Sequence, residues 1–230
     1  MRCFNCGAFA LLDFCYTCSL ELSELSLNVR ELEISKKSSK RLLGMPDFQN
    51  EAFLKPNSVL NDEIFKFNDF QSDKLKVYSF YKYSDIKHLL LSKHKFYGYF
   101  IYHFLARLSF ARFKEFFAPN IKISALPLDD KVENQLYSHS AILAKYLKSK
   151  SIKPIFNALK AQNHIKYSGQ SLNFRMKNKR KFKLLKAIKE PVILVDDIIT
   201  TGSSLLEARQ VLKKHKINVL FALVLADARE

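Results

Sequence analysis

The residues best suited to chemistry lie between positions 192 and 204, in the segment VILVDDIITTGSS. Four apolar residues, typical of a buried parallel strand, run into the acid pair Asp196 and Asp197. A helix is predicted just beyond, and its mouth carries hydroxyl groups and one glycine, at Thr200, Thr201, Gly202, Ser203 and Ser204. Ligands of open α/β sheets bind beyond the carboxyl ends of the strands, and helix N-termini attract anions. The acids can accept hydrogen bonds from sugar hydroxyls while the loop donates to a phosphate, so the segment predicts a sugar-phosphate site.

Other nucleotide-binding patterns fit this segment less well. Four apolar residues followed by Asp also describe a Walker B strand, but that assignment requires a G-x-x-x-x-G-K-[ST] loop. The five glycines, at positions 7, 44, 98, 169 and 202, form neither that loop nor a Rossmann G-x-G-x-x-G. An ordinary capped helix after a strand needs fewer polar residues than this segment carries.

The four cysteines form a second candidate site. Cys3 and Cys6 make one C-x-x-C pair, Cys15 and Cys18 make another, and eight residues separate the pairs. Two such pairs match a closed, tetrahedral, structural Zn²⁺ site, and metal binding would supply folding energy to so short a segment. A redox C-x-x-C would need one motif in a βαβ setting, and an iron–sulfur cluster is the remaining alternative.

Around these sites, strands alternate with helices. Apolar and β-branched runs predict strands at residues 77–83, 121–126, 152–159, 191–195 and 219–225. Helical spacing predicts helices at 86–96, capped by Ser84 or Asp85, and at 99–117, 138–148 and 203–216. This order indicates an α/β domain with a mainly parallel sheet flanked by helices. We expect a zinc module with a connector at residues 1–35, followed by the α/β domain at 36–230.

The charge of the chain points to polyanionic partners. Its formal net charge is +16, which favours nucleic acid, an anionic membrane or phosphate-rich small molecules. Residues 175–189 hold eight basic residues and no acid, with Phe174 before them and Phe182 among them. Basic residues interleaved with aromatics bind single strands without sequence preference, although a solvated loop that neutralises a phosphate ligand is the alternative. The candidate nucleic-acid contacts are Arg175, Lys177, Lys179, Arg180, Lys181 and Lys183.

The sequence also bears on location. It contains no window of about 20 apolar residues that would span a membrane. The first residues lack the cleavage pattern of a signal peptide, and paired cysteines without an export signal are typical of metal binding in a reducing cytoplasm. We therefore expect a cytoplasmic protein.

The segment VILVDDIITTGSS resembles, position by position, the 5-phosphoribosyl-1-pyrophosphate (PRPP) signature of type I phosphoribosyltransferases. The resemblance implies that Asp196 and Asp197 hold the ribose hydroxyls and that residues 200–204 hold the 5-phosphate. It also implies a type I phosphoribosyltransferase fold and a Mg²⁺ ion that bridges pyrophosphate and ribose oxygens.

Cysteine pairs followed by this signature resemble the ComF family, phosphoribosyltransferase-like proteins linked to DNA uptake in natural transformation. Further matching features are the step KFYG at 95–98, the strand end ALPL at 125–128, and the spaced residues Gln170, Arg175, Asn178 and Phe182. The resemblance implies PRPP binding and a role in DNA processing during transformation, with proteins of DNA uptake or processing as partners. Single-stranded DNA as a partner is the expectation drawn from the basic stretch at 175–189.

Two stretches depart from the ComF pattern. The family's R-G-F-N-Q helix start is replaced by QLYSH at 135–139, and the expected pyrophosphate loop reads PLDDK at 127–131. Lys131 could offset the two acids of that loop. No catalytic base stands out, so two alternatives stay open beside the first: a non-enzymatic module with PRPP as a modulating ligand, and an active phosphoribosyltransferase of nucleobase or nucleotide metabolism.

Overall fold

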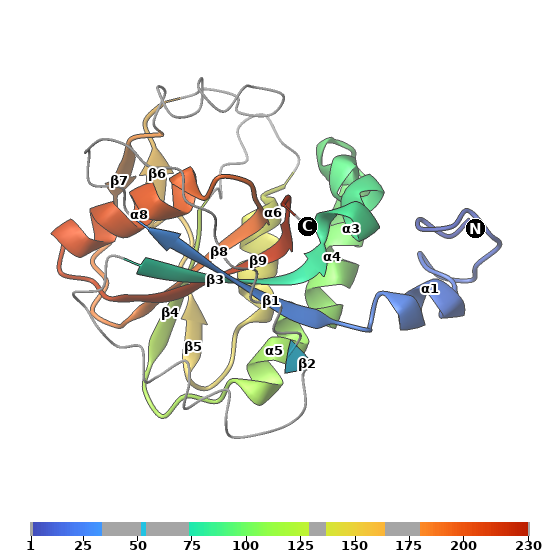
Figure 1. The fold of residues 1–230 in the computed structure, drawn as a ribbon, viewed down its shortest axis with the longest axis horizontal. Helices are drawn as coiled ribbons and strands as arrows, with labels where there is room; N and C mark the ends of the chain where they lie inside the picture. The colour runs from blue at the N-terminus through green and yellow to red at the C-terminus, as the bar shows by residue number, and fades with distance from the viewer. Residues whose placement is uncertain (1, 34–51, 54–73, 129–136, 164–179, 230) are drawn as a thin grey trace, which may run out of the picture.

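The computed structural model describes residues 2–33, 52–53, 74–128, 137–163 and 180–229, which form an α/β fold (Figure 1). Their elements, in chain order, are α1 (Tyr16–Glu21), β1 (Ser26–Glu33), β2 (Ala52–Phe53), β3 (Lys74–Lys82), α3 (Tyr83–Leu90), the 3-10 helix η1 (Leu91–His94), α4 (Gly98–Leu108), α5 (Phe110–Phe116), β4 (Ile123–Pro127), α6 (His139–Tyr146), β5 (Ile152–Pro154), β6 (Leu159–Ala161), β7 (Phe182–Leu184), β8 (Val192–Ile199), α8 (Ser203–Lys214) and β9 (Val219–Asp227).

The described strands make a seven-stranded mixed sheet in the order β2-β1-β3-β9-β8-β4-β5. The five strands from β3 to β5 are parallel, whereas β1 runs antiparallel to both β2 and β3. β6 and β7 form a separate antiparallel pair. The predicted sheet, mainly parallel and flanked by helices, is confirmed.

Helices cover both faces of the sheet, so β4 and the first half of β8 are buried throughout. On one face, Ile193 and Val195 of β8 pack in a core with residues of α3, α4, α5 and α6. On the other, Val192 and Leu194 pack in a second core with residues of α8. Strand alternation therefore sends successive side chains of β8 to different helices.

The chain reverses its direction of travel across the sheet between β4 and β8, which are neighbours. From β4 the chain passes through α6 to β5 on one side, and from β8 it passes through α8 to β9 on the other side. Such a switch point leaves a crevice beyond the carboxyl ends of the two strands, where ligands of open α/β sheets bind. In this chain the acid pair lies on β8, one of the two strands at the switch point.

Several expected elements differ in their bounds. The helix predicted at 99–117 is broken at Ser109, whose hydroxyl donates to the Leu105 carbonyl oxygen at 2.6 Å and bends the chain. The helix predicted from residue 86 begins at Tyr83, and neither Ser84 nor Asp85 caps it, because its N-cap is Lys82. The strand predicted at 152–159 ends at Pro154.

The segment after the cysteines belongs to the main sheet. Residues of β1, which sequence patterning placed in a connector, pair with β3 from Asn28 through Glu33. In Figure 1, β1 leads from the N-terminal module across the front of the sheet. Among the described helices, none has the length and apolar character needed to cross a membrane.

Candidate functional site

The four cysteines come together at the N-terminus. The Sγ atoms of Cys3, Cys6, Cys15 and Cys18 all lie within 4.8 Å of one another. The Cys6 and Cys15 Sγ atoms are 3.7 Å apart, close to the separation of about 3.8 Å that a tetrahedral ion with bonds of about 2.3 Å imposes. The cluster could therefore bind a metal such as zinc, as the spacing predicts.

Backbone N–H groups favour the thiolate of Cys3, whereas the net effect at Cys18 is the opposite. Burial opposes ionisation of Cys3, but N–H groups of Cys15, Cys6 and Asn5 outweigh it and lower the pKa of Cys3 to about 6. A side-chain hydrogen bond from Asn5 favours the Cys18 thiolate, whereas burial and the three neighbouring sulfur atoms raise the pKa of Cys18 to about 12. Four negative sulfur atoms repel one another at this separation, and a divalent cation among them would relieve the repulsion.

Aromatic rings dock the cysteine module onto α4. Phe14 stacks on Phe104 with ring centroids 3.9 Å apart and an interplanar angle of 12°. Phe4 stacks on Tyr97 at 5.6 Å. The module is part of the larger core, which includes two of the cysteines, so its metal would stabilise an interface as well as a loop.

The acid pair lies within β8, which extends four residues beyond the predicted strand end. Asp196 and Asp197 are successive residues of β8, so their side chains leave the strand in different directions. Asp196 Oδ1 accepts from the Asp197 N–H at 2.9 Å, and Asp197 Oδ1 accepts from the Ile198 N–H at 2.8 Å. The structure therefore places the two carboxylates next to each other in the chain but against different neighbours.

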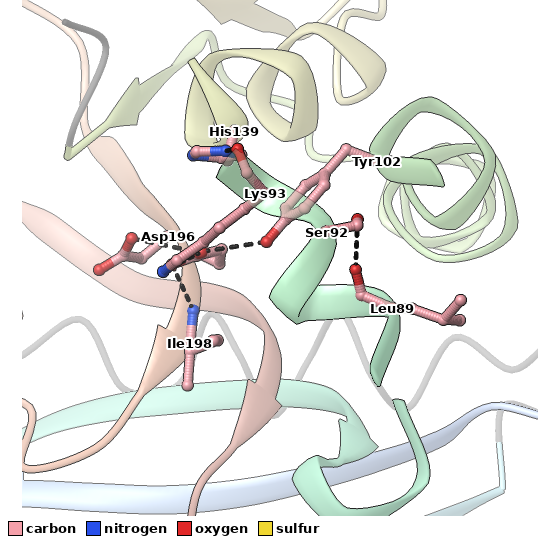
Figure 2. A network of polar contacts seen from close by, with 8 residues as sticks. Leu89, Ser92, Lys93, Tyr102, His139, Asp196 and Ile198 are labelled. Carbon is pink, nitrogen blue, oxygen red and sulfur yellow. Dashed lines mark hydrogen bonds and ion pairs between the residues drawn. The ribbon is translucent and has the colours of Figure 1, made fainter. Parts of the chain in front are cut away.

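η1 and α4 supply polar partners to Asp197. Figure 2 shows two of these partners, Lys93 and Tyr102, together with the nearby His139. Lys93 Nζ lies 3.4 Å from Asp197 Oδ2, and the Tyr102 hydroxyl donates to the same oxygen at 3.2 Å. Burial alone would raise the pKa of Asp197, but the positive charge of Lys93, the nearby His139 and the hydrogen bonds outweigh it and lower the pKa below its ordinary value of 3.8. Burial beside Asp197 raises the pKa of Tyr102, so its hydroxyl stays a donor.

The start of α6 closes this side of the switch point. His139, the first residue of α6, shares a hydrogen bond of 2.7 Å between its Nε2 and the Lys93 carbonyl oxygen. Ser138 caps the helix by accepting from the Ala141 N–H at 3.1 Å. His139 of α6 thus holds the backbone of η1, whose Lys93 ammonium lies beside Asp197.

The hydroxyl run forms the N-terminus of α8. Gly202 is the N-cap, with φ of 74°, a left-handed conformation that glycine adopts without penalty. A Cβ atom added there would lie 2.3 Å from Leu32 Cδ1. The hydroxyls of Thr201 and Ser203 share a hydrogen bond of 2.8 Å at the helix start, where N–H groups and the helix dipole favour an anion.

Other predicted site residues are only partly described. Lys131, Arg175, Lys177 and Lys179 lie outside the described residues. The N–H groups of Arg180 and Lys181 both donate to the Glu207 carboxylate, and Lys183 is exposed on β7. Phe182 is only 6% exposed and packs in the second core, so in this conformation it cannot stack on a base.

Sequence reasoning missed three residues that surround the predicted segment. Lys93 and Tyr102 lie about a hundred positions before Asp197, and Arg30, on β1, donates to the Thr200 carbonyl oxygen. None of them belongs to a recognisable motif, so no local pattern could have identified them. A scan against models of known protein families and a search among curated proteins both found no match for this chain.

Proposed function

We propose that this protein binds PRPP at the switch point between β4 and β8, in a fold of the type I phosphoribosyltransferase class. One observation carries the proposal. The acid pair lies on β8, and the chain continues through Gly202, in the left-handed conformation, and four hydroxyl residues into α8, a helix of 12 residues. Carboxylates suit ribose hydroxyls, whereas free N–H groups and hydroxyl donors suit a phosphate. Both chemistries lie on one continuous stretch of chain, as a sugar phosphate requires.

In this proposal each part of the segment has one task. Asp196 and Asp197 accept hydrogen bonds from the ribose hydroxyls, and Lys93 keeps Asp197 ionised for that purpose. Residues 200–204 hold the 5-phosphate at the start of α8. Mg²⁺ would enter with the ligand, because this ion retains waters and uses substrate phosphate oxygens. Lys131 would face the pyrophosphate.

We further propose a ComF-like role in DNA uptake during natural transformation, in the cytoplasm, with single-stranded DNA and DNA-processing proteins as partners and zinc in the cysteine cluster. The support is the resemblance of the sequence motifs, the net charge of +16, and two exposed lysines, Lys181 just before β7 and Lys183 on it. Single-strand affinity should fall steeply with salt, and it should fall further when Lys181 and Lys183 are changed to Glu. Unchanged affinity in that variant would remove this stretch from the interface.

Calorimetric titration with PRPP and Mg²⁺ tests the site. Changing Asp196 and Asp197 together to alanine should weaken binding by at least about 100-fold, because hydrogen bonds to charged groups contribute roughly 1.5–3 kcal/mol each. The matched control changes two exposed acids, Glu21 and Glu115, to alanine, so that the net charge changes equally. That control should bind like the native chain.

A second pair of ligands sharpens the assignment. Ribose 5-phosphate should bind more tightly than 2-deoxyribose 5-phosphate, because the acids are assigned to the ribose hydroxyls. No binding of PRPP by the native chain would overturn the proposal. Turnover of PRPP with a panel of purine and pyrimidine bases would instead establish the alternative, an active phosphoribosyltransferase.

A further inference from the structure

Arg30, on β1, connects the N-terminal part of the chain to the hydroxyl loop. Its Nη1 donates to the Thr200 carbonyl oxygen at 2.9 Å and to the two carboxylate oxygens of Asp227 at 3.0 and 3.2 Å. Thr200 and Asp227 lie 170 and 197 positions further along the sequence. The side chains of Arg30 and Asp227 are only 14% and 5% exposed, so water competes little for these hydrogen bonds.

The contact falls on the turn that leads into the loop. Thr200 follows the last residue of β8, and Asp227 is the last residue of β9. The two strand ends are themselves joined, since the Ala228 N–H donates to the Ile199 carbonyl oxygen at 2.8 Å. Arg30 therefore pins the first peptide of the loop to a rigid corner of the sheet.

A second residue of β1 supports the same loop from the same face of the strand. Leu32 lies two positions after Arg30, so strand alternation places both side chains on one side. Leu32 packs in the second core, and its Cδ1 atom occupies the space that a Cβ atom on Gly202 would need. The loop thus rests on β1 at Gly202 and is tied to it at Thr200.

We propose that Arg30 is a positioning residue for the phosphate loop, and that β1 is part of the ligand site. The expected effect of Arg30 on PRPP affinity rests on the proposed function. The expected effect of Arg30 on the order of residues 200–204 does not depend on that function. Arg30 fixes the Thr200 peptide so that the N–H and hydroxyl groups of the loop converge on one anion. A preorganised loop spends less binding energy on ordering itself, so the loss of Arg30 should weaken affinity.

Two measurements on Arg30→Met test this inference. Amide hydrogen exchange of residues 200–206 should be at least tenfold faster than in the native chain, and PRPP affinity should fall at least tenfold. The matched control is Glu31→Gln, at the next position of β1, where the lost partner is the exposed Lys74 at 3.1 Å. Neither exchange in the loop nor affinity should change in that control.

A double variant separates positioning from general stability. Arg30→Met leaves Asp227 buried without its cation, which by itself destabilises the fold. Adding Asp227→Asn removes that unpaired charge and should restore most of the melting temperature. Thr200 still lacks its donor, so fast exchange in the loop and weak PRPP binding should persist.

The outcomes are distinct. If affinity returns together with the melting temperature in the double variant, Arg30 serves only the fold and the proposal is overturned. Failure of both variants to fold would lead to the same conclusion. If the native chain does not bind PRPP, the proposed function fails, while hydrogen exchange still decides whether Arg30 orders the loop.

Discussion

The cysteine cluster and the acid-hydroxyl site are built in different ways. All four candidate metal ligands lie within the first 18 residues, and backbone N–H groups of the same segment donate to the Cys3 sulfur atom. The acid-hydroxyl site takes its central segment from β8 and α8 but its supporting cations from η1 and β1. One site is local in sequence, and the other is assembled by the sheet.

This difference decides how each site responds to change. A local cluster depends on its own four side chains, because a metal bound there would supply most of the energy that holds them together. An assembled site spreads its support over several partners, each of which contributes one or two hydrogen bonds. Single changes should therefore have large effects at the cluster and graded effects at the acid-hydroxyl site.

The largest effect is expected at the cluster. Changing Cys18 to Ser should reduce the metal content to near zero and lower the free energy of unfolding by about 4 kcal/mol, or roughly 10 °C in melting temperature. Elemental analysis and thermal melting, with and without a chelator, would measure both. Ser19→Ala, one position further in α1, is the control. Full metal content in the serine variant would show that the four sulfurs do not act as one site.

An intermediate effect is expected when each site loses its left-handed glycine. Gly202→Ala should destabilise the fold by about 2–3 kcal/mol, because left-handed strain adds to a clash with Leu32. Gly7→Ala, with φ of 76° and no heavy atom within 4 Å of the added Cβ, should lose only about 1 kcal/mol. Denaturant unfolding compares the two variants. Equal losses would mean that Leu32 yields and that packing under the loop is loose.

The smallest effect concerns the ionisation of Asp197. A carboxylate whose pKa is lowered by folding stabilises the fold at every pH above its ordinary pKa of 3.8. That contribution is lost as the pH falls through the lower pKa of the folded state. Lys93→Met should raise the pKa of Asp197 and lower stability at neutral pH by about 1–2 kcal/mol.

Affinity measured against pH gives a readout specific to that carboxyl. As the pH is lowered, PRPP binding by Lys93→Met should begin to weaken at a higher pH than binding by the native chain. The titration of the ligand itself affects both proteins equally. Lys95→Met is the matched control, because Lys95 Nζ lies 5.5 Å above the Tyr97 ring rather than beside an acid. Parallel pH profiles for Lys93→Met and the native chain would exclude Lys93 from this role.

Local pattern and structure agree best where one element is buried on both faces. The apolar run at 191–195 predicted β8, because burial on both faces leaves few alternatives. The helical spacing of Leu205, Ala208 and Leu212 predicted α8, which buries one face. Agreement fails at Ser109, where apolar spacing continues but the helix is interrupted and the Ser109 hydroxyl donates to the Leu105 carbonyl oxygen. It fails again beyond residue 195, where apolar patterning stopped at the acids while pairing with β9 continues to Ile199.

What the sequence determined by itself is the chemistry that lies within short stretches of chain. Paired cysteines, and two acids followed by a hydroxyl run, are recognisable because their residue types and spacing are restrictive. Only the tertiary structure decided which basic side chains lie beside the acids and the hydroxyl run. Lys93 reaches Asp197, and Arg30 reaches Thr200, because parallel pairing and helix packing bring distant segments together, and no periodicity records such contacts. The physical reason is that side-chain contacts between distant segments depend on the order and register of the strands. The identity of a single lysine or arginine carries no information about that order or register.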